Sequence, residues 1–448
     1  MFKSLKGRAV LIVGIVAIAF WSLYPPEEKI HLGLDLQGGM HVVLEVQLDD
    51  AIDFDVKRMK EEIAQHLDSK DIQYRTIEQF GLNSMKLQFA TSNDRYQSAK
   101  EIKKNFPALD VVSQKDQFLQ YTLEKAYEEQ LRNRALRQAK DIILNRIDKF
   151  GVSEPSIQIQ GENRIIVQLP GIQDMSRAEK LLQQTAQLEF RLASEDEEKL
   201  KEALAGEPPP GYEVLYMEFP QEGRVDRLPM LVKKIPEMTG AMLKDARATF
   251  DPQYNRPVVS FELDSIGTKI FAEVTKNNIE RPLAIILDGN IVSAPRIQSE
   301  IPGGAGVISG SFSTEEAKDL AVILTSGALP APVEKIQDMR VGPSLGSDSI
   351  KQGLMAGIGG MIGVSIFMVI YYLMGGLVAN IALALNILIV FGILAMLKAT
   401  LTLPGIAGII LTIGMAVDAN VLIFERIREE LKLGKRIRSA IDTGYQKQ

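Results

Sequence analysis

Residues 401–424 read LTLPGIAGIILTIGMAVDANVLIF, an apolar run long enough to cross a bilayer as a helix. Asp418 is the only charged residue in this run, and it is also the only acid between Lys351 and Glu425. A carboxylate in hydrocarbon costs about 2.5–3.5 kcal/mol on insertion scales, so such residues persist where they have a role. The run therefore predicts a proton or ion site at Asp418. The structural alternative is an Asp that stays protonated and bonds to a neighbouring helix.

Small and polar residues accompany this site in the sequence. Gly414 lies one turn before Asp418 and leaves room for another helix to approach the carboxyl group. We expect three uncharged polar residues to support Asp418 within the membrane, although Asn420 lies on a different side of the helix: Asn420, Thr412 and Asn386. An earlier apolar run contains two G-x-x-x-G spacings, which predict close helix packing, at Gly353, Gly357, Gly359, Gly360 and Gly363.

The composition excludes several classes of function. The chain has 448 residues, a formal net charge of -6, no cysteine and three histidines. The lack of cysteine excludes disulfides and thiolate catalysis, and so few histidines predict no metal site. A net negative charge leaves no basic footprint for nucleic acid. The sequence contains no phosphate-binding Gly-Lys-Ser/Thr ending, and one intramembrane acid does not make the pair that an aspartyl protease needs. We therefore predict a protein that is not an enzyme and holds no cofactor.

Four apolar runs predict four membrane crossings, at residues 9–24, 350–373, 376–397 and 401–424. Basic residues precede the first run and follow the last, so the positive-inside rule places residues 1–8 and 425–448 in the cytoplasm and residues 25–349 outside. A cleaved signal peptide would share the basic start and apolar core, but no Ala-x-Ala site follows. The mean hydropathy of +0.02 requires a large polar region beside the apolar helices.

The region between the first two crossings predicts two α+β lobes. In the first, residues 25–205, a helix at 123–150, a hairpin at 156–169, a helix at 176–184 and a strand at 187–192 complete the β-α-β-β-α-β rhythm of a ferredoxin-like base. EPPPG at residues 207–211 marks a break, and a separate head lobe follows at residues 206–327. In the head, Asp288-Gly289-Asn290 predicts a hairpin turn, and Ser313 with Glu316 predicts a capping box. Residues 328–349 form an extended return linker to the membrane.

The motif GLDLQGG, residues 33–39, lies just after the first apolar run. Glycine adopts left-handed backbone conformations at low cost, and an aspartate can bond nearby backbone amides. The motif therefore predicts a tight turn near the membrane, formed by Gly33, Asp35, Gln37, Gly38 and Gly39.

Several segments, in this order, resemble the SecD/SecF family of the resistance-nodulation-division superfamily. They are GLDLQGG at 33–39, RIIVQLPG at 164–171, GALPAP at 327–332, VGPSLG at 341–346, PGIAG at 404–408 and DANVLIFERI at 418–427. The resemblance implies a multi-pass protein of the bacterial inner membrane with a periplasmic ferredoxin-like base and a mobile head. It also implies SecF, the SecYEG translocon and unfolded preprotein as partners, in addition to the lipid bilayer. Asp418 matches the family's intramembrane acid, which is assigned to proton passage.

The resemblance favours assistance to protein export that depends on the proton motive force, with preprotein captured on the periplasmic side. Two alternatives remain open: a passive membrane-tethered periplasmic holdase, and a small-molecule exporter of the same superfamily. Family members usually have six membrane helices. We therefore expect two further helices beyond this chain, because residues 439–445 resemble the approach to a fifth.

Overall fold

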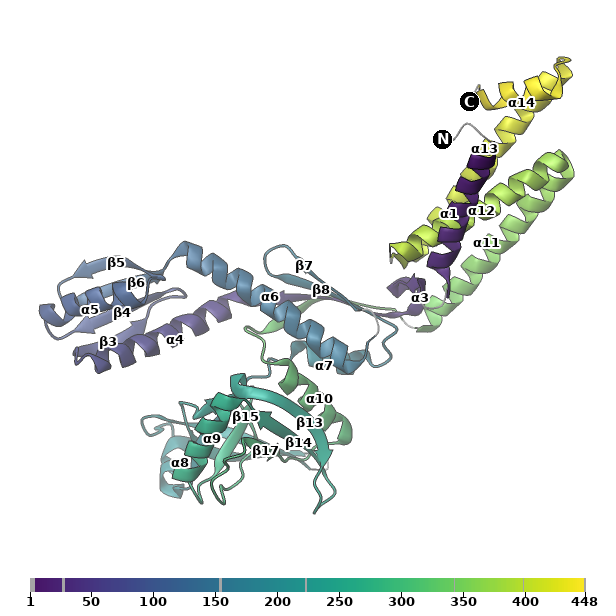
Figure 1. Ribbon diagram of the computed structural model, residues 1–448. Coiled ribbons are helices and arrows are strands. Elements are labelled where there is room, and N and C mark those ends of the chain that lie inside the picture. The colour runs from purple at the N-terminus through teal and green to yellow at the C-terminus, as the bar shows by residue number, and fades with distance from the viewer. Residues whose placement is uncertain are drawn as a thin grey trace. The chain divides into compact units, whose positions relative to one another are not determined.

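A computed structural model describes residues 5–25, 29–152, 155–221, 224–341, 343–397 and 399–446 (Figure 1). The chain divides into two compact units. The first contains residues 1–41, 169–173 and 339–448, and the second contains residues 42–168 and 174–338. The first unit holds the apolar helices and the second holds most of the α+β region. This agrees with the predicted fold class of an α-helical membrane bundle plus a large α+β region with a head lobe.

Four helices of the first unit overlap the four predicted crossings. They are α1 (Leu5–Leu23), α11 (Pro343–Tyr372), α12 (Met374–Met396) and α13 (Leu403–Lys432). Helix α14 (Ile437–Gln446) lies in the predicted tail. Among the described residues, α11, α12 and α13 are long and apolar enough to span a membrane. The apolar part of α1, Val10–Leu23, is shorter than the about 20 residues that a spanning helix needs.

Close contacts join α1 and α11 to α12. A side chain at Gly392 would place its Cβ 2.8 Å from Ala19, and the Ser22 hydroxyl donates to the Gly392 carbonyl at 2.9 Å. The Asn380 amide donates to the Ser365 carbonyl of α11 at 3.0 Å, as expected for a polar bond between membrane helices. Figure 1 shows α11, α12 and α13 running alongside one another.

The packing predicted from the G-x-x-x-G spacings is wrong within this chain. Cβ atoms added at Gly353, Gly359, Gly360 and Gly363 would meet nothing within 4 Å, and one at Gly357 would touch only Ile410, at 3.5 Å. Only 6% of the apolar segment of α11 is buried. The spacing favours close packing against another helix, but no helix in the described part of this chain packs closely on these glycines.

The base contains the predicted ferredoxin-like sheet, with one strand exchanged. Its strand order is β18 (Val333–Val341), β2 (Gly39–Val46), β8 (Arg164–Pro170) and β7 (Ser156–Gln160). The helices α6 (Lys125–Phe150) and α7 (Met175–Gln183) complete the β-α-β-β-α-β pattern. The last strand is β18 from the predicted return linker. The predicted strand at 187–192 is β9 (Leu188–Ser194), which pairs with head strand β15 instead.

An additional lobe is inserted between β2 and α6. It contains α4 (Leu48–Ser69), β3 (Tyr74–Gln79), β4 (Ser84–Phe89), α5 (Ser92–Asn105), β5 (Leu109–Lys115) and β6 (Phe118–Leu123). The strands pair in the order β3-β4-β6-β5. Alternating side chains such as Met85, Leu87 and Phe89 are buried against Ile52 and Ile63 of α4, so this lobe has its own core.

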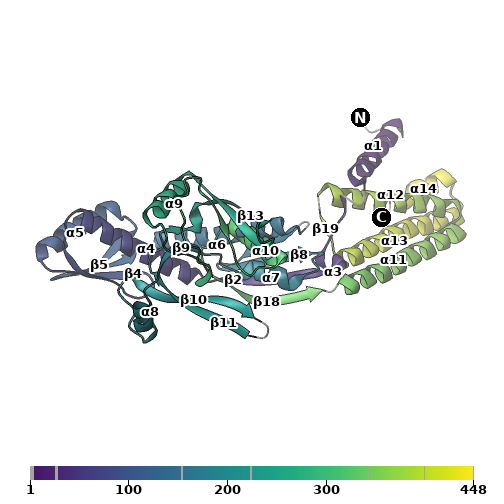
Figure 2. The same cartoon turned by 90° about the horizontal axis from the view of Figure 1, so that it is seen from below.

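The head begins at β9 and combines two sheets. The first has the order β11 (Arg224–Lys233), β10 (Tyr212–Gln221), β16 (Asn290–Ser293), β15 (Leu283–Leu287), β9 and β12 (Met238–Thr239). Because β11 also pairs with β9, five of these strands close into a ring. The second sheet is β13 (Leu243–Phe250), β14 (Pro257–Leu263) and β17 (Ala305–Ile308). The long β10–β11 hairpin is clear in Figure 2.

Local signals in the head are confirmed. Asp288 and Gly289 both have positive φ, 49° and 81°, as the predicted two-residue turn requires. Ser313 and Glu316 form the complete capping box of α10 (Thr314–Ser326). The remaining head elements are α8 (Glu197–Leu204), the 3-10 turn Gly240–Met242 and α9 (Ser265–Asn277). Phe190, Phe261 and Phe271 contact one another in the head core.

Candidate functional site

Asp418 lies in the second half of α13. The Thr402 hydroxyl caps this helix by accepting from the Gly405 amide at 3.3 Å, and a proline occupies the first turn, where it is tolerated. The Asp418 side chain is exposed on the surface of this chain. It makes no hydrogen bond or ion pair with any residue that the structure describes. A membrane around α13 would therefore leave this carboxyl group facing lipid or a partner helix.

Asp418 borders an apolar groove of about 900 Å³. The groove is lined from α13 by Gly414, Val417 and Val421, from α11 by Gly357 and Met361, and from α12 by Phe391. Gly414 is thus on the same side as Asp418, as the sequence predicts. The groove therefore places apolar side chains from three helices beside the only acid of the run.

The three predicted supporting residues make no direct contact with the carboxyl group. The Thr412 hydroxyl donates to the Gly408 carbonyl at 2.8 Å, and the Asn420 amide donates to the Ala416 carbonyl at 3.0 Å. Both bonds lie within α13. Asn386 is half-buried on α12, and its side chain makes no hydrogen bond in the described part of the chain. The role of these residues around Asp418 stays a prediction.

The GLDLQGG motif docks beside the start of α13. The two-residue strand β1 (His31–Leu32) pairs in parallel with β19 (Thr400–Leu401), and the Gly33 amide donates to the Leu401 carbonyl at 2.7 Å. The short helix α3 (Leu34–Gln37) follows, and its last residue, Gln37, is exposed. The motif is thus a structural turn attached to the loop that precedes the Asp418 helix. The Asp35 side chain lies outside the described residues.

Two glycines close this turn. The Gly38 carbonyl accepts from the Gly171 amide at 3.0 Å. Gly39 has φ +132°, and a Cβ there would lie 2.2 Å from the Leu169 carbonyl oxygen. Only glycine fits this backbone and this close approach.

The second unit contains a cavity of about 1230 Å³. Helix α6 supplies one wall, mostly with amide and charged side chains, and Phe54 from α4 adds an aromatic ring that is 62% exposed. Residues 239–241 and 324–330 supply another wall from the head and the segment that follows it. The walls of the cavity thus combine apolar groups with amide and charged side chains.

Arg146 of α6 holds together the two chain segments that connect the head to the base. Its side chain is completely buried. The guanidinium donates to the carbonyls of Leu181, at 2.8 Å, and Gln184 at the end of α7. It also donates to Thr185, at 3.4 Å, and to Gly327 after α10, at 3.2 Å. Burial lowers the pKa of Arg146 to about 10, so the group remains a cation at neutral pH.

Asp288 binds residues 185–187, the segment that leads from the base into the head. Its carboxylate accepts from the Thr185 hydroxyl and from the amides of Ala186, at 3.1 Å, and Gln187, at 2.8 Å. The Leu329 amide, in the returning segment, donates to the Thr185 carbonyl at 2.8 Å. The two connecting segments are therefore bonded to each other and to residues of α6 and the head.

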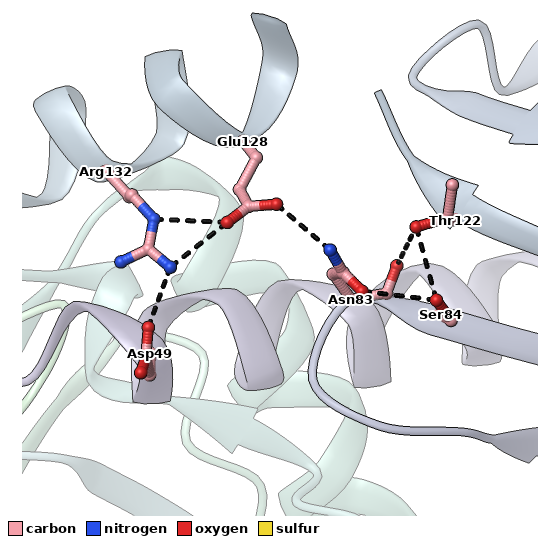
Figure 3. A network of polar contacts seen from close by, with 6 residues as sticks. All are labelled: Asp49, Asn83, Ser84, Thr122, Glu128 and Arg132. Atoms are coloured by element: carbon pink, nitrogen blue, oxygen red, sulfur yellow. Dashed lines mark hydrogen bonds and ion pairs between the residues drawn. The ribbon is translucent and has the colours of Figure 1, made fainter. Parts of the chain in front are cut away.

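A polar network fixes the inserted lobe to α6 (Figure 3). Arg132 donates to Asp49 of α4 at 2.8 Å and to Glu128 at 3.1 and 3.2 Å, and the Asn83 amide donates to Glu128 at 3.1 Å. Burial by itself would lower the pKa of Arg132, but the bonds to Asp49 and Glu128 outweigh it and raise that pKa. Charge-assisted hydrogen bonds therefore connect α6 to α4 and to the loop before β4, and this network has a structural role.

Three family models match the chain. One, described as the SecDF P1 head subdomain, matches residues 213–331. A second, described as the N-terminal part of the P1 domain of protein translocase subunit SecDF, matches residues 136–195. The third, described as the C-terminal part of protein export membrane protein SecD/SecF, matches residues 325–447. Together they cover parts of the base, the head and all three long apolar helices.

Curated relatives decide the family. A protein translocase subunit SecD from Syntrophobacter fumaroxidans is 44% identical over 99% of this chain and 87% of its own length. The chain belongs to the SecD family. A SecD from Desulfurispirillum indicum is 44% identical over 100% of the chain and 87% of its length, and one from Magnetococcus marinus is 45% identical over 94% and 80%. The motif-based resemblance to SecD is thereby confirmed.

Solved SecDF structures resemble the chain as well. A crystal structure of SecDF, described as a translocon-associated membrane protein from Thermus thermophilus, is 34% identical over 98% of this chain, with a TM-score of 0.47. A SecDF structure in a super-membrane-facing form is 32% identical over 98% of this chain, with a TM-score of 0.42. This SecD chain spans about half the length of those two solved chains, 50% and 49%.

Arg146 is the residue that the sequence alone does not single out. It lies beside Ile147 and one turn after Ile143, both completely buried on the apolar face of α6. An arginine on such a face indicates that hydrogen-bond acceptors lie nearby, because a buried guanidinium needs several of them. Its four acceptors come from residues 181–185 and 327, far along the chain, so their identity requires the tertiary structure.

Proposed function

We propose that this chain is a proton-motive-force-dependent subunit that assists protein export across the bacterial inner membrane. Membership of the SecD family supports the export role, because the relatives are named as protein translocase subunits. The observation that carries the proton dependence is Asp418, the single carboxyl group in the apolar run of α13 that ends at Phe424, exposed beside an apolar groove. Moving one elementary charge through 100 mV releases about 2.3 kcal/mol, enough to bias a two-state arrangement.

The uncovered surface of the helices supports a membrane partner. Asp418, the groove beside it and the four free glycines of α11 all lie on faces that no described part of this chain covers. A carboxyl group that faces lipid is costly, and small residues favour close contact with another helix. SecF is the partner that we propose for this surface, and SecYEG is the proposed translocon. No enzymatic step is proposed for the chain.

The proposed topology has both termini in the cytoplasm and the α+β region in the periplasm. The chain has no cysteine, so single cysteines at Gln253 in the head and Lys432 at the end of α13 report the two sides without background. Both positions are exposed. In spheroplasts, we expect a membrane-impermeant maleimide to label Gln253→Cys at once and Lys432→Cys only after permeabilisation. Labelling of both positions before permeabilisation would refute the topology.

The cavity in the second unit is the proposed site of preprotein capture. Phe54 offers an exposed aromatic ring at its wall, and Ala241 lines the cavity from the head. We expect photo-crosslinkers at Phe54 and Ala241 to capture a stalled secretory chain. Phe80 provides a matched control, because it is as exposed as Phe54, 65% against 62%, but lies outside the cavity. Crosslinks confined to α11–α13, or equal at Phe80, would contradict capture at this cavity.

A further inference from the structure

Helix α14 leaves an apolar strip uncovered at the end of the membrane-spanning part of the chain. Ile437, Ile441 and Tyr445 recur every fourth residue and are 69%, 41% and 60% exposed. Such a spacing places them along one side of the helix. Leu433, in the turn between α13 and α14, is 75% exposed. Three large apolar side chains on a ten-residue helix form a surface that water does not favour.

The other edge of the same apolar face packs on α13. Ala440 is completely buried. A Cβ at Gly444 would lie 2.5 Å from the Ile427 side chain and 3.5 Å from the Ile423 carbonyl. Helix α14 therefore turns back along α13 (Figure 1). Gly444, near the end of α14, lies against Ile423 and Ile427. The apolar run of α13 ends at Phe424 and the first charged residue after it is Glu425, so this level is the boundary of the hydrocarbon region.

The charges left unmatched at this boundary are mainly positive. Glu430 is buried and pairs with Arg426, at 2.9 Å, and with Lys435, at 2.6 Å. The other two carboxylates of the α13 end are also paired, Glu425 with Arg428 at 3.5 Å and Glu429 with Arg426 at 2.8 Å.

Three exposed cations next to α14 have no such partner. The side chains of Lys432, Arg436 and Arg438 make no ion pair or hydrogen bond with any described residue. At about 100° per residue, Arg436 and Arg438 lie to either side of Ile437, at the two borders of the apolar face. Against these three cations the helix itself carries a single acid, Asp442.

We propose that α14 lies in the membrane interface and binds anionic phospholipid headgroups. Ile437, Ile441 and Tyr445 enter the boundary between headgroups and acyl chains, while Arg436 and Arg438 extend their long side chains to the phosphates. The charge pattern favours lipid over a protein helix as the occupant. A helix partner on the strip would have to bury Arg438 at its free edge, whereas an anionic surface attracts both arginines, by about fivefold in binding per cation.

A fluorescent label at Ile441→Cys tests this proposal in the whole chain, reconstituted into vesicles. In vesicles of phosphatidylcholine and phosphatidylglycerol, we expect a lipid-borne nitroxide to quench the label at position 441. Iodide in the water should quench this label at least fivefold less than it quenches a label at Ser439→Cys, on the polar face of the helix. In pure phosphatidylcholine vesicles, or at high salt, iodide quenching at position 441 should rise severalfold. Inorganic phosphate added to phosphatidylcholine vesicles should not restore protection. Tyr445→Cys provides a second reporter should the first position be perturbed.

The double substitution R436Q/R438Q tests the charge requirement. It should expose the label at position 441 in phosphatidylglycerol vesicles, whereas K103Q/K104Q, with the same charge loss on exposed side chains of α5, should change nothing. Equal protection in both lipids, unaffected by R436Q/R438Q, would mean that protein covers the strip and would overturn the proposal. Iodide access in every vesicle would overturn it too. None of these readouts depends on export or on Asp418, so the proposed function can fail separately.

Discussion

Asp418→Asn is expected to abolish the gradient-dependent gain in export while the protein stays inserted and folded. Asparagine has nearly the same shape and can still form hydrogen bonds, but it cannot release a proton. A carboxylate costs about 2.5–3.5 kcal/mol in hydrocarbon. Its loss should therefore make the insertion free energy of α13 more favourable, by no more than this amount. The measurement is translocation of a model preprotein into vesicles of a depleted strain, with SecF supplied, with and without an imposed proton gradient.

Two further substitutions frame this result. Asp418→Glu keeps the carboxyl group and shifts it by one methylene, so partial function is expected. Asp110→Asn removes an exposed carboxylate from β5 in the second unit and should leave export unchanged. If Asp418→Asn preserves the full gradient-dependent gain at normal expression, Asp418 is structural and the passive holdase is the better hypothesis. A gradient-driven efflux of a small molecule without any effect on preprotein would favour the exporter.

Arg146→Met is expected to loosen both connections between the head and the base. Methionine fills similar volume but leaves the carbonyls of Leu181, Gln184 and Gly327 without the donor that they have in the structure. Each buried acceptor left unpaired costs about 1–3 kcal/mol. A loss of about 3 kcal/mol in the local opening free energy corresponds to about a hundredfold faster exchange. Hydrogen exchange of the whole chain in detergent, followed at residues 181–187 and 327–329, is the measurement.

A matched control lies on the same helix. Arg137 is exposed and its side chain makes no hydrogen bond or ion pair with a described residue. Arg137→Met should therefore change the local opening free energy by no more than about 0.5 kcal/mol. Arg146→Lys keeps a cation but has three donors on one nitrogen, which do not reach four separated carbonyls. We expect an intermediate result. Equal exchange in Arg146→Met and the unsubstituted protein would show that the two segments are held by the other contacts of the head.

Features set by neighbouring residues could be predicted from the sequence. The long apolar helices follow from runs without charge, because a spanning helix satisfies its own backbone bonds within one segment. The hairpin at Asp288 and Gly289 and the capping box of Ser313 follow from side chain and backbone interactions a few residues apart. Asp418 stands out for the same reason: one charge in an apolar run is visible without knowledge of what packs against it.

Features that join distant segments required the tertiary structure. Periodicity identified the strand now seen as β9, but not its partner, because a strand satisfies its backbone bonds on another strand. Strand β18 therefore completes the base sheet, while β9 pairs with β15 in the head. The G-x-x-x-G spacings likewise marked a face suited to close packing and could not say whether this chain supplies the neighbour.

By itself, the sequence determined the family, the apolar helices and the identity of the single acid between Lys351 and Glu425. Only the tertiary structure decided that Asp418 borders an exposed groove, that GLDLQGG docks beside the start of its helix, and that Arg146 bonds both head connections. The physical reason is the range of the interactions. Transfer to lipid, turns and caps act within a few residues, whereas hydrogen bonds and packing between segments depend on where folding brings them.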